Sequence, residues 1–168
     1  MTGATQTATT TQVYRVYIKA SPEAIWDAIT KPEWSDRYGY GGFVEFDLRP
    51  GGAYRARPSA EMAAHENVPD VVIDGEVLEA DPPRRLVQTW RMLMDAGMAA
   101  EGFTRLTYEI QDAANGVTKL TVTHELEGKP MLSALLSGEW EDRGAGGGWS
   151  WVLSTLKTVL ETGEELVH

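Results

Sequence analysis

Two segments at opposite ends of the chain constrain its fold most. Near the start, residues 18–34 predict a strand that leads into a capped helix and then into a second short helix. Near the end, residues 148–161 predict one long amphipathic helix. The stretch between them is typical of antiparallel strands. This order of elements favours an α+β fold in which a curved sheet grips a helix and a cavity lies between the two layers.

The first strand and helix carry clear local signals. Residues 13–19 alternate between two faces, which is typical of a half-buried strand. Ser21 is a good N-cap, and Pro22 suits the first helical position because its missing N–H needs no partner there. Lys31 and Pro32 then end this helix and begin the next. The sequence therefore predicts a strand followed by two short helices.

Six further segments have the composition of strands. Arg49 to Gly52 is a strong hairpin signal between the first two of them. A polar, Ala-rich insertion, residues 59–70, is interpreted as a loop or short helix, and a Met/Ala-rich stretch around Gly97 as a separator. The predicted strands are residues 43–48, 53–57, 71–79, 86–92, 104–110 and 117–124. With the first strand they make a seven-stranded sheet.

The closing helix has a continuous apolar side that includes Trp149, Leu153 and Leu156. Polar side chains lie opposite, so we expect this helix to pack on the sheet with its apolar face inward. Residues 144–148, directly before it, are nearly all glycine and are interpreted as a flexible hinge.

Length and composition point to one soluble domain. A length of 168 residues predicts a single domain, at residues 13–168. The Thr/Ala/Gln-rich composition of residues 1–12 predicts a disordered tail. There is no cysteine, so disulfides and thiolate metal sites are excluded. The first dozen residues have neither the basic stretch nor the apolar run of a signal peptide or membrane anchor. We therefore expect a cytoplasmic protein without membrane insertion.

The charge of the chain argues against polyanionic partners. The formal net charge is −10, and the basic residues are scattered rather than clustered. Such a surface repels nucleic-acid backbones and anionic lipids. Nucleic-acid binding is therefore not expected, and nothing in the sequence specifies an oligomeric state.

Strand parity predicts which side chains share the inward face of the sheet. That face is mostly aliphatic and aromatic, and it carries a few polar groups of the kind that orient a ligand in an apolar pocket. The alternative, that these groups bond backbone or water in an ordinary core, stays open. The predicted ligand-binding residues are Tyr54, Gln88, Trp90, Tyr108, His124, Trp149 and Leu153.

No group of residues points to catalysis by itself. The glycine runs lack the lysine of a phosphate-binding loop, and His65 lacks the second histidine of a helical zinc site, so neither a cofactor nor a metal is expected. His124 is the best single candidate for proton transfer, because it occupies an apolar face and its pKa is easily moved across neutrality. A core histidine with satisfied hydrogen bonds is the competing interpretation.

Several short motifs together carry a family resemblance. They span nearly the whole chain beyond its N-terminal tail, and their order and spacing are specific where each alone is weak. The matching segments are residues 20–22 with 25–30, Pro32 with Trp34, residues 50–54, 75–86 with 89–90, 121–124, and 148–149 with Leu153, Leu156 and Leu160. In these the chain resembles the SRPBCC (START/Bet v allergen-like) superfamily, and within it the branch homologous to the activator of the heat-shock protein 90 ATPase.

The resemblance implies a helix-grip fold: a seven-stranded antiparallel sheet curved around the C-terminal helix, with two small helices at one end and a hydrophobic tunnel between helix and sheet. It implies no particular reaction, because the superfamily spans carriers, receptors and cyclases, and it brings no invariant catalytic set.

Three functions follow as hypotheses. The first is binding or sequestration of a small apolar or polycyclic molecule, in natural-product biosynthesis or antibiotic self-resistance; residues 92–98 and the glycine run would suit an adaptable mouth. The second is a polyketide cyclase or aromatase that uses His124, Tyr108 or Gln88. The third is a protein-binding module of the chaperone-activator type.

Overall fold

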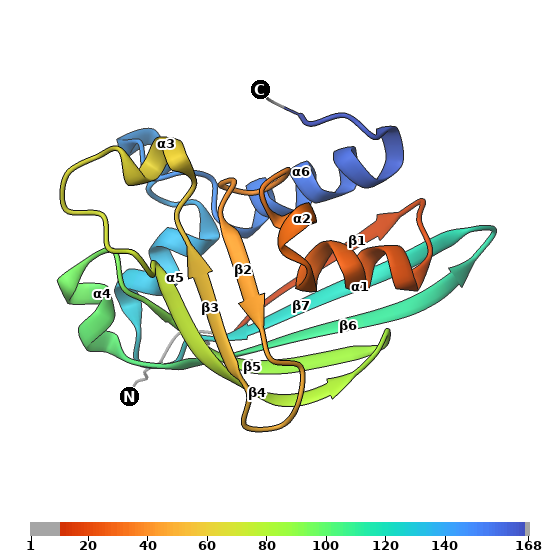
Figure 1. Cartoon of the computed structure of the whole chain (residues 1–168), viewed down its shortest axis with the longest axis horizontal. Coiled ribbons are helices and arrows are strands. Elements are labelled where there is room, and N and C mark those ends of the chain that lie inside the picture. The colour runs from red at the N-terminus through yellow and green to blue at the C-terminus, as the bar shows by residue number, and fades with distance from the viewer. Residues whose placement is uncertain (1–10, 167–168) are drawn as a thin grey trace, which may run out of the picture.

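A computed structural model describes residues 11–166 and shows a seven-stranded antiparallel sheet bent beneath a C-terminal helix (Figure 1). The sheet order is β1-β7-β6-β5-β4-β3-β2. The strands are β1 (Thr11–Ile18), β2 (Phe43–Phe46), β3 (Ala53–Arg57), β4 (Ile73–Asp81), β5 (Arg85–Met92), β6 (Thr104–Ala114) and β7 (Val117–Glu125). The helices are α1 (Pro22–Thr30), α2 (Pro32–Ser35), α3 (Ala60–Ala63), α4 (Ala96–Glu101), α5 (Pro130–Ser137) and α6 (Trp149–Thr162), with a 3₁₀ helix at Glu141–Arg143. The predicted helix-grip architecture is confirmed.

The start of α1 forms as its local signals predict. The Ser21 hydroxyl accepts a hydrogen bond from the Ala24 amide at 3.1 Å, and Pro22 occupies the first turn. Lys31 ends the helix in an extended conformation just before Pro32. Helices α1 and α2 therefore stand side by side at one end of the sheet (Figure 1).

Strand β1 begins at Thr11, two residues before the predicted start of the domain. Thr11 pairs with Glu125, and Gln12 pairs with His124 on β7. The Gln12 side-chain amide also donates to the Ser133 carbonyl of α5 at 2.9 Å. Thr11 and Gln12 thus belong to the folded domain, and residues 1–10 of the predicted tail lie outside the described residues.

Helices α4 and α5 occupy segments in which no helix was predicted. The Asp95 carboxylate accepts from the Met98 amide at 3.0 Å and so caps α4. Glu101, the last residue of α4, accepts from the Met131 and Leu132 amides, each at 3.0 Å. These amides are in the first turn of α5, where backbone N–H groups have no acceptor within their own helix. A carboxylate is favoured at this end of a helix. The two helices therefore depend on each other.

The glycine run before α6 is a packed turn in this structure, not an unattached hinge. Gly148 adopts φ +67°, and a Cβ built on it would collide with the Leu136 carbonyl of α5. Its amide donates to the Tyr40 hydroxyl oxygen at 3.0 Å. Glycine is required at this position because both the positive φ and the close backbone approach exclude a side chain.

The core lies between the inward face of the sheet and the helices. Near β1 and β7 the layers meet closely, and Ile18, Leu120, Val122 and Leu156 are 0–1% exposed. Helix α6 is fastened to the β1 edge where the Lys157 ammonium donates to the Tyr17 carbonyl at 2.7 Å. Among residues 11–166, no helix is long and apolar enough to cross a bilayer.

Candidate functional site

A cavity of about 600 Å³ lies on the inward side of β2 to β5, under the start of α6. Its walls come from the segment after α2, from these strands, from α4 and α5, and from the glycine run. Ile29, Trp90 and Trp149 form part of its buried surface, at 5–6% exposure each, whereas Tyr40 and Met94 are more than 40% exposed at its mouth. The interior is therefore hollow at this end of the molecule, with an opening to solvent.

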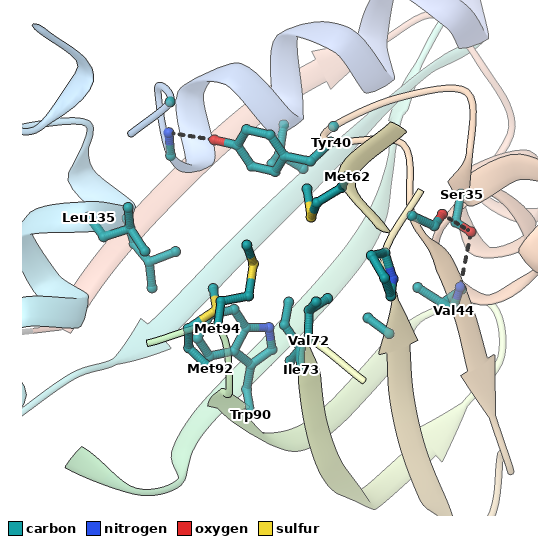
Figure 2. A pocket seen from close by; sticks show the side chains of 18 of the residues that line it. Ser35, Tyr40, Val44, Met62, Val72, Ile73, Trp90, Met92, Met94 and Leu135 are labelled. Atoms are coloured by element: carbon teal, nitrogen blue, oxygen red, sulfur yellow. Dashed lines mark hydrogen bonds between the residues drawn. The ribbon is translucent and has the colours of Figure 1, made fainter. Parts of the chain in front are cut away.

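Methionines form much of the mouth. Met62 of α3 points into the cavity beside Met92 and Met94, with Trp90 below them (Figure 2). Met98 of α4 completes the group. Unbranched thioether side chains adapt to guests of different shape, so this placement agrees with the adaptable mouth expected from residues 92–98.

The structure brings together four of the seven predicted ligand-binding residues. Tyr54 of β3, Trp90 of β5, Tyr108 of β6 and Trp149 of α6 all line the cavity. The other three, Gln88, His124 and Leu153, are buried on the expected face but are not among the lining residues. Alternation along the strands identified residues that face inward. The position of each residue along its strand decides whether it reaches the cavity or lies in the packed core.

His124 is held by hydrogen bonds at both ring nitrogens. Its Nδ1 accepts from the Trp149 indole N–H at 3.1 Å, and its Nε2 lies 2.7 Å from the Thr104 hydroxyl. That hydroxyl donates to the Trp90 carbonyl at 2.8 Å, so its oxygen accepts the Nε2 proton of His124. The network therefore specifies a neutral imidazole protonated at Nε2.

This environment argues against His124 as a general base. The ring is 0% exposed, and burial lowers the pKa of His124 to about 3. Its nitrogens have no free position for a substrate, and an imidazole with so low a pKa is a weak base at neutral pH. The histidine instead ties the first turn of α6 to β5, β6 and β7.

Gln88 is also a core residue in this structure. Its side chain is 1% exposed, and its amide nitrogen makes a long hydrogen bond of 3.3 Å to the Thr89 carbonyl. Its Oε1 is the one buried side-chain oxygen or nitrogen in residues 11–166 that has no partner. The cavity lining does not include it, so a role in polarising a guest is not supported by its position.

Three tyrosines, Tyr38, Tyr54 and Tyr108, line the cavity. The Tyr38 hydroxyl donates to the Ala28 carbonyl at 2.9 Å. Burial first, and then the neighbouring tyrosines, raise the pKa values of Tyr54 and Tyr108 well above the usual value. These hydroxyls therefore stay protonated at neutral pH and are hydrogen-bond donors.

The two charged side chains of the lining are already paired. Arg57 lies 3.2 Å from the Glu45 carboxylate, and Asp95 caps α4 through the Met98 amide. Neither is left to neutralise a charged guest. The remaining lining is apolar apart from the tyrosine and Ser35 hydroxyls, the Trp90 indole N–H and backbone groups, and Ser35 donates to the Gly42 carbonyl at 2.9 Å.

Comparison with protein-family models decides the family. Residues 19–161 match the model described as activator of Hsp90 ATPase homolog 1-like protein. The chain belongs to this family. The match confirms the branch expected from the sequence motifs, and a comparison with curated proteins finds no match.

Solved structures similar to this family member share its fold. An HSP90 activator from Plasmodium falciparum is 20% identical, with 89% of this chain and 95% of that chain covered and a TM-score of 0.59. CalU16 from Micromonospora echinospora is 20% identical, with 88% and 72% covered and a TM-score of 0.59. DynU16, from the dynemicin biosynthetic locus, is 20% identical, with 92% and 48% covered and a TM-score of 0.61. At these identities the likeness establishes the fold alone.

Sequence reasoning missed several lining residues of this family member. Tyr38 and Tyr40 come from the irregular segment after α2, Met62 from the polar insertion, and Val152 from α6. The two tyrosines alternate with Gly39 and Gly41, and this is a usable signal because binding residues are disproportionately placed on loops.

Proposed function

We propose that this protein binds a small apolar molecule in the cavity under α6 and thereby carries or sequesters it. The observation that supports this most directly is a hollow of about 600 Å³ with a mostly apolar lining and an opening at the methionine mouth. Ligand pockets typically enclose about 300–1,000 Å³ and combine apolar walls with a few polar groups. The tyrosine hydroxyls supply those polar groups here.

Ala56 offers a sharp test of the site. It lies on β3 with its side chain toward the cavity, and it is 8% exposed, whereas Ala53 on the same strand is exposed on the opposite face. Ala56→Phe should fill the hollow and weaken binding of the uncharged dye Nile red by roughly tenfold or more, since overlap with the guest is strongly unfavourable. Ala53→Phe, the same change on the outer face, should leave the dye affinity unchanged.

Fluorescence titration measures both variants, and thermal unfolding checks that each is folded. If Ala56→Phe does not fold, Val44→Phe can replace it in the test, because Val44 of the neighbouring strand β2 lines the same cavity. No Nile red binding to the wild-type protein, or equal binding by the blocked and unblocked variants, contradicts the proposal.

We further propose that the guest is a natural-product-like polycycle, handled in a biosynthetic or self-resistance setting. Two similar structures, CalU16 and DynU16, support this, the second being from the dynemicin biosynthetic locus. A thermal-shift screen should show larger shifts with polycyclic compounds than with acyl chains of equal carbon number. A guest at about a hundred times its Kd stabilises the protein by about 2.7 kcal/mol. Larger shifts with the acyl series would contradict this part.

The two other hypotheses differ in their support. A cyclase that uses His124 would need a free ring nitrogen, and both are engaged. The protein-binding function is favoured by the family match and by the similar Plasmodium falciparum activator. Stimulation of a heat-shock protein 90 ATPase by the purified protein, undiminished by Ala56→Phe, would favour that alternative over small-molecule binding.

A further inference from the structure

We infer that the cavity selects an uncharged guest with a hydrogen-bond acceptor, such as a ketone, quinone or ether oxygen, which the Tyr54 and Tyr108 hydroxyls hold together. This inference rests on the proposed function and specifies the chemical class of its ligand. It assigns these two tyrosines as specificity-determining residues.

The two rings are held in place by aromatic neighbours, so their hydroxyls have defined directions. Tyr54 packs on Phe46 with 4.6 Å between ring centroids, and Tyr108 stands edge-on to Trp149 at 6.1 Å. The rings come from β3 and β6, which are separated in the sheet by β4 and β5, yet both line the same cavity. Side chains fixed in this way bind with little loss of rotational freedom.

Neither hydroxyl has a hydrogen-bond partner within residues 11–166, although Tyr38 beside them donates to Ala28. Both hydroxyl oxygens are accessible from the cavity, since Gln88 Oε1 is the one fully buried polar side-chain atom without a partner among these residues. Two unpaired donors that face one hollow therefore point to an acceptor supplied from outside the chain. A guest without an acceptor would displace water from both groups and leave them unpaired, which is unfavourable.

The charges of the cavity exclude an ionic guest. The tyrosines are neutral at physiological pH because burial raises their pKa values. Arg57 is paired with Glu45, and Asp95 with the N-terminus of α4. A carboxylate or ammonium group would lose its hydration at the inner wall without gaining a counter-charge. The acceptor is therefore a neutral oxygen.

Three tricyclic probes of similar size separate these requirements: fluorene without an acceptor, fluorenone with one carbonyl, and fluorene-9-carboxylate with a charge. Competition with Nile red gives the affinity of each. The wild-type protein should prefer fluorenone to fluorene, and the double variant Tyr54→Phe/Tyr108→Phe should reduce that ratio by about fivefold for each hydroxyl lost, as expected for a net hydrogen bond. Tyr17→Phe, on the exposed outer face of β1, should leave the ratio unchanged.

The readout is a ratio of two probes, so a general change in packing, which affects both alike, does not move it. Binding of fluorene and fluorenone with the same ratio in the wild type and the double variant would overturn the inference while the proposed function stands. Fluorene-9-carboxylate binding as tightly as fluorenone would overturn the requirement for a neutral guest. If neither Nile red nor any of the three probes binds, the proposed function itself fails, and this inference with it.

Discussion

Two groups of polar side chains lie on the inward side of the same sheet, and they differ in how their hydrogen bonds are satisfied. Around His124 every polar atom has a partner: Trp149, Thr104 and the Trp90 carbonyl close the network. Around Tyr54 and Tyr108 the hydroxyls are left open beside a hollow. Residue type alone would rank the histidine as the functional group. The structure indicates that the histidine stabilises the fold, whereas the tyrosine hydroxyls stay open to the cavity in which we propose that a guest binds.

The largest expected effect comes from breaking the closed network. His124→Ala removes a fully buried ring and leaves the Trp149 indole N–H and the Thr104 hydroxyl without their partner. We expect a loss of about 3 kcal/mol in the free energy of unfolding, from the cavity and the unpaired groups together. Urea denaturation measures it.

The matched control is the same substitution at His65, which is exposed, where a change below about 0.5 kcal/mol is expected. Equal stability of the His124 and His65 variants would show that the network contributes nothing to the fold.

Acidification sharpens the same distinction with a smaller effect. The pKa of His124 is about 3 in the folded protein, and it returns to about 6.5 on unfolding, so the unfolded chain gains a proton first as pH falls. The contribution of the neutral His124 ring to the free energy of unfolding is fully present above about pH 6.5. It is lost progressively below that pH, by about 2 kcal/mol between pH 7 and pH 5. Urea unfolding across this range measures the loss.

His124→Asn should lack this contribution, and His65→Ala should keep it. Because carboxylates titrate mainly below this range, the difference in slope between the wild type and His124→Asn isolates the buried ring. Parallel slopes for the two would contradict a neutral His124 in the native state.

The smallest effects are expected at the open group. Tyr54→Phe removes a hydroxyl that has no partner within residues 11–166, so stability should change by less than about 0.5 kcal/mol. Tyr38→Phe removes a hydroxyl that donates to the Ala28 carbonyl, and it should cost about 1 kcal/mol. Thermal and urea unfolding of the two variants, side by side, measure the difference. A larger loss at Tyr54 than at Tyr38 would mean that Tyr54 also stabilises the empty protein.

Elements with local signals could be predicted from the sequence, and elements held by distant partners could not. Ser21 and Pro22 specify the start of α1 within one turn, and the α6 stripe is long enough to identify its inward face. By contrast, α5 is short, and its first amides are capped by Glu101, about thirty positions away. Caps of this kind leave no local pattern, which is why α5 was missed.

The site was predicted in part for a similar reason. Alternation along a strand predicted that Tyr54, Gln88, Tyr108 and His124 face inward, and all four are at least half-buried. Alternation does not tell where opposing layers separate, so it could not distinguish the tyrosines at the cavity from Gln88 and His124 in the packed core. The hydrogen bonds that occupy His124 come from residues 20 and 25 positions away in the sequence, and they become visible only when the sheet and α6 are assembled.

The contact between the Tyr40 hydroxyl and the Gly148 amide has a consequence for how fast a guest can enter and leave the cavity. This bond of 3.0 Å joins two sides of the cavity mouth, and both its groups are uncharged (Figure 2). The same loop is also tied to α6 through Gly39, whose amide donates to the Thr155 hydroxyl at 2.8 Å and whose carbonyl accepts from the Trp151 indole at 2.9 Å. Opening the mouth on this side means breaking several bonds at about 1 kcal/mol each, so we expect a bound guest to leave slowly by this route.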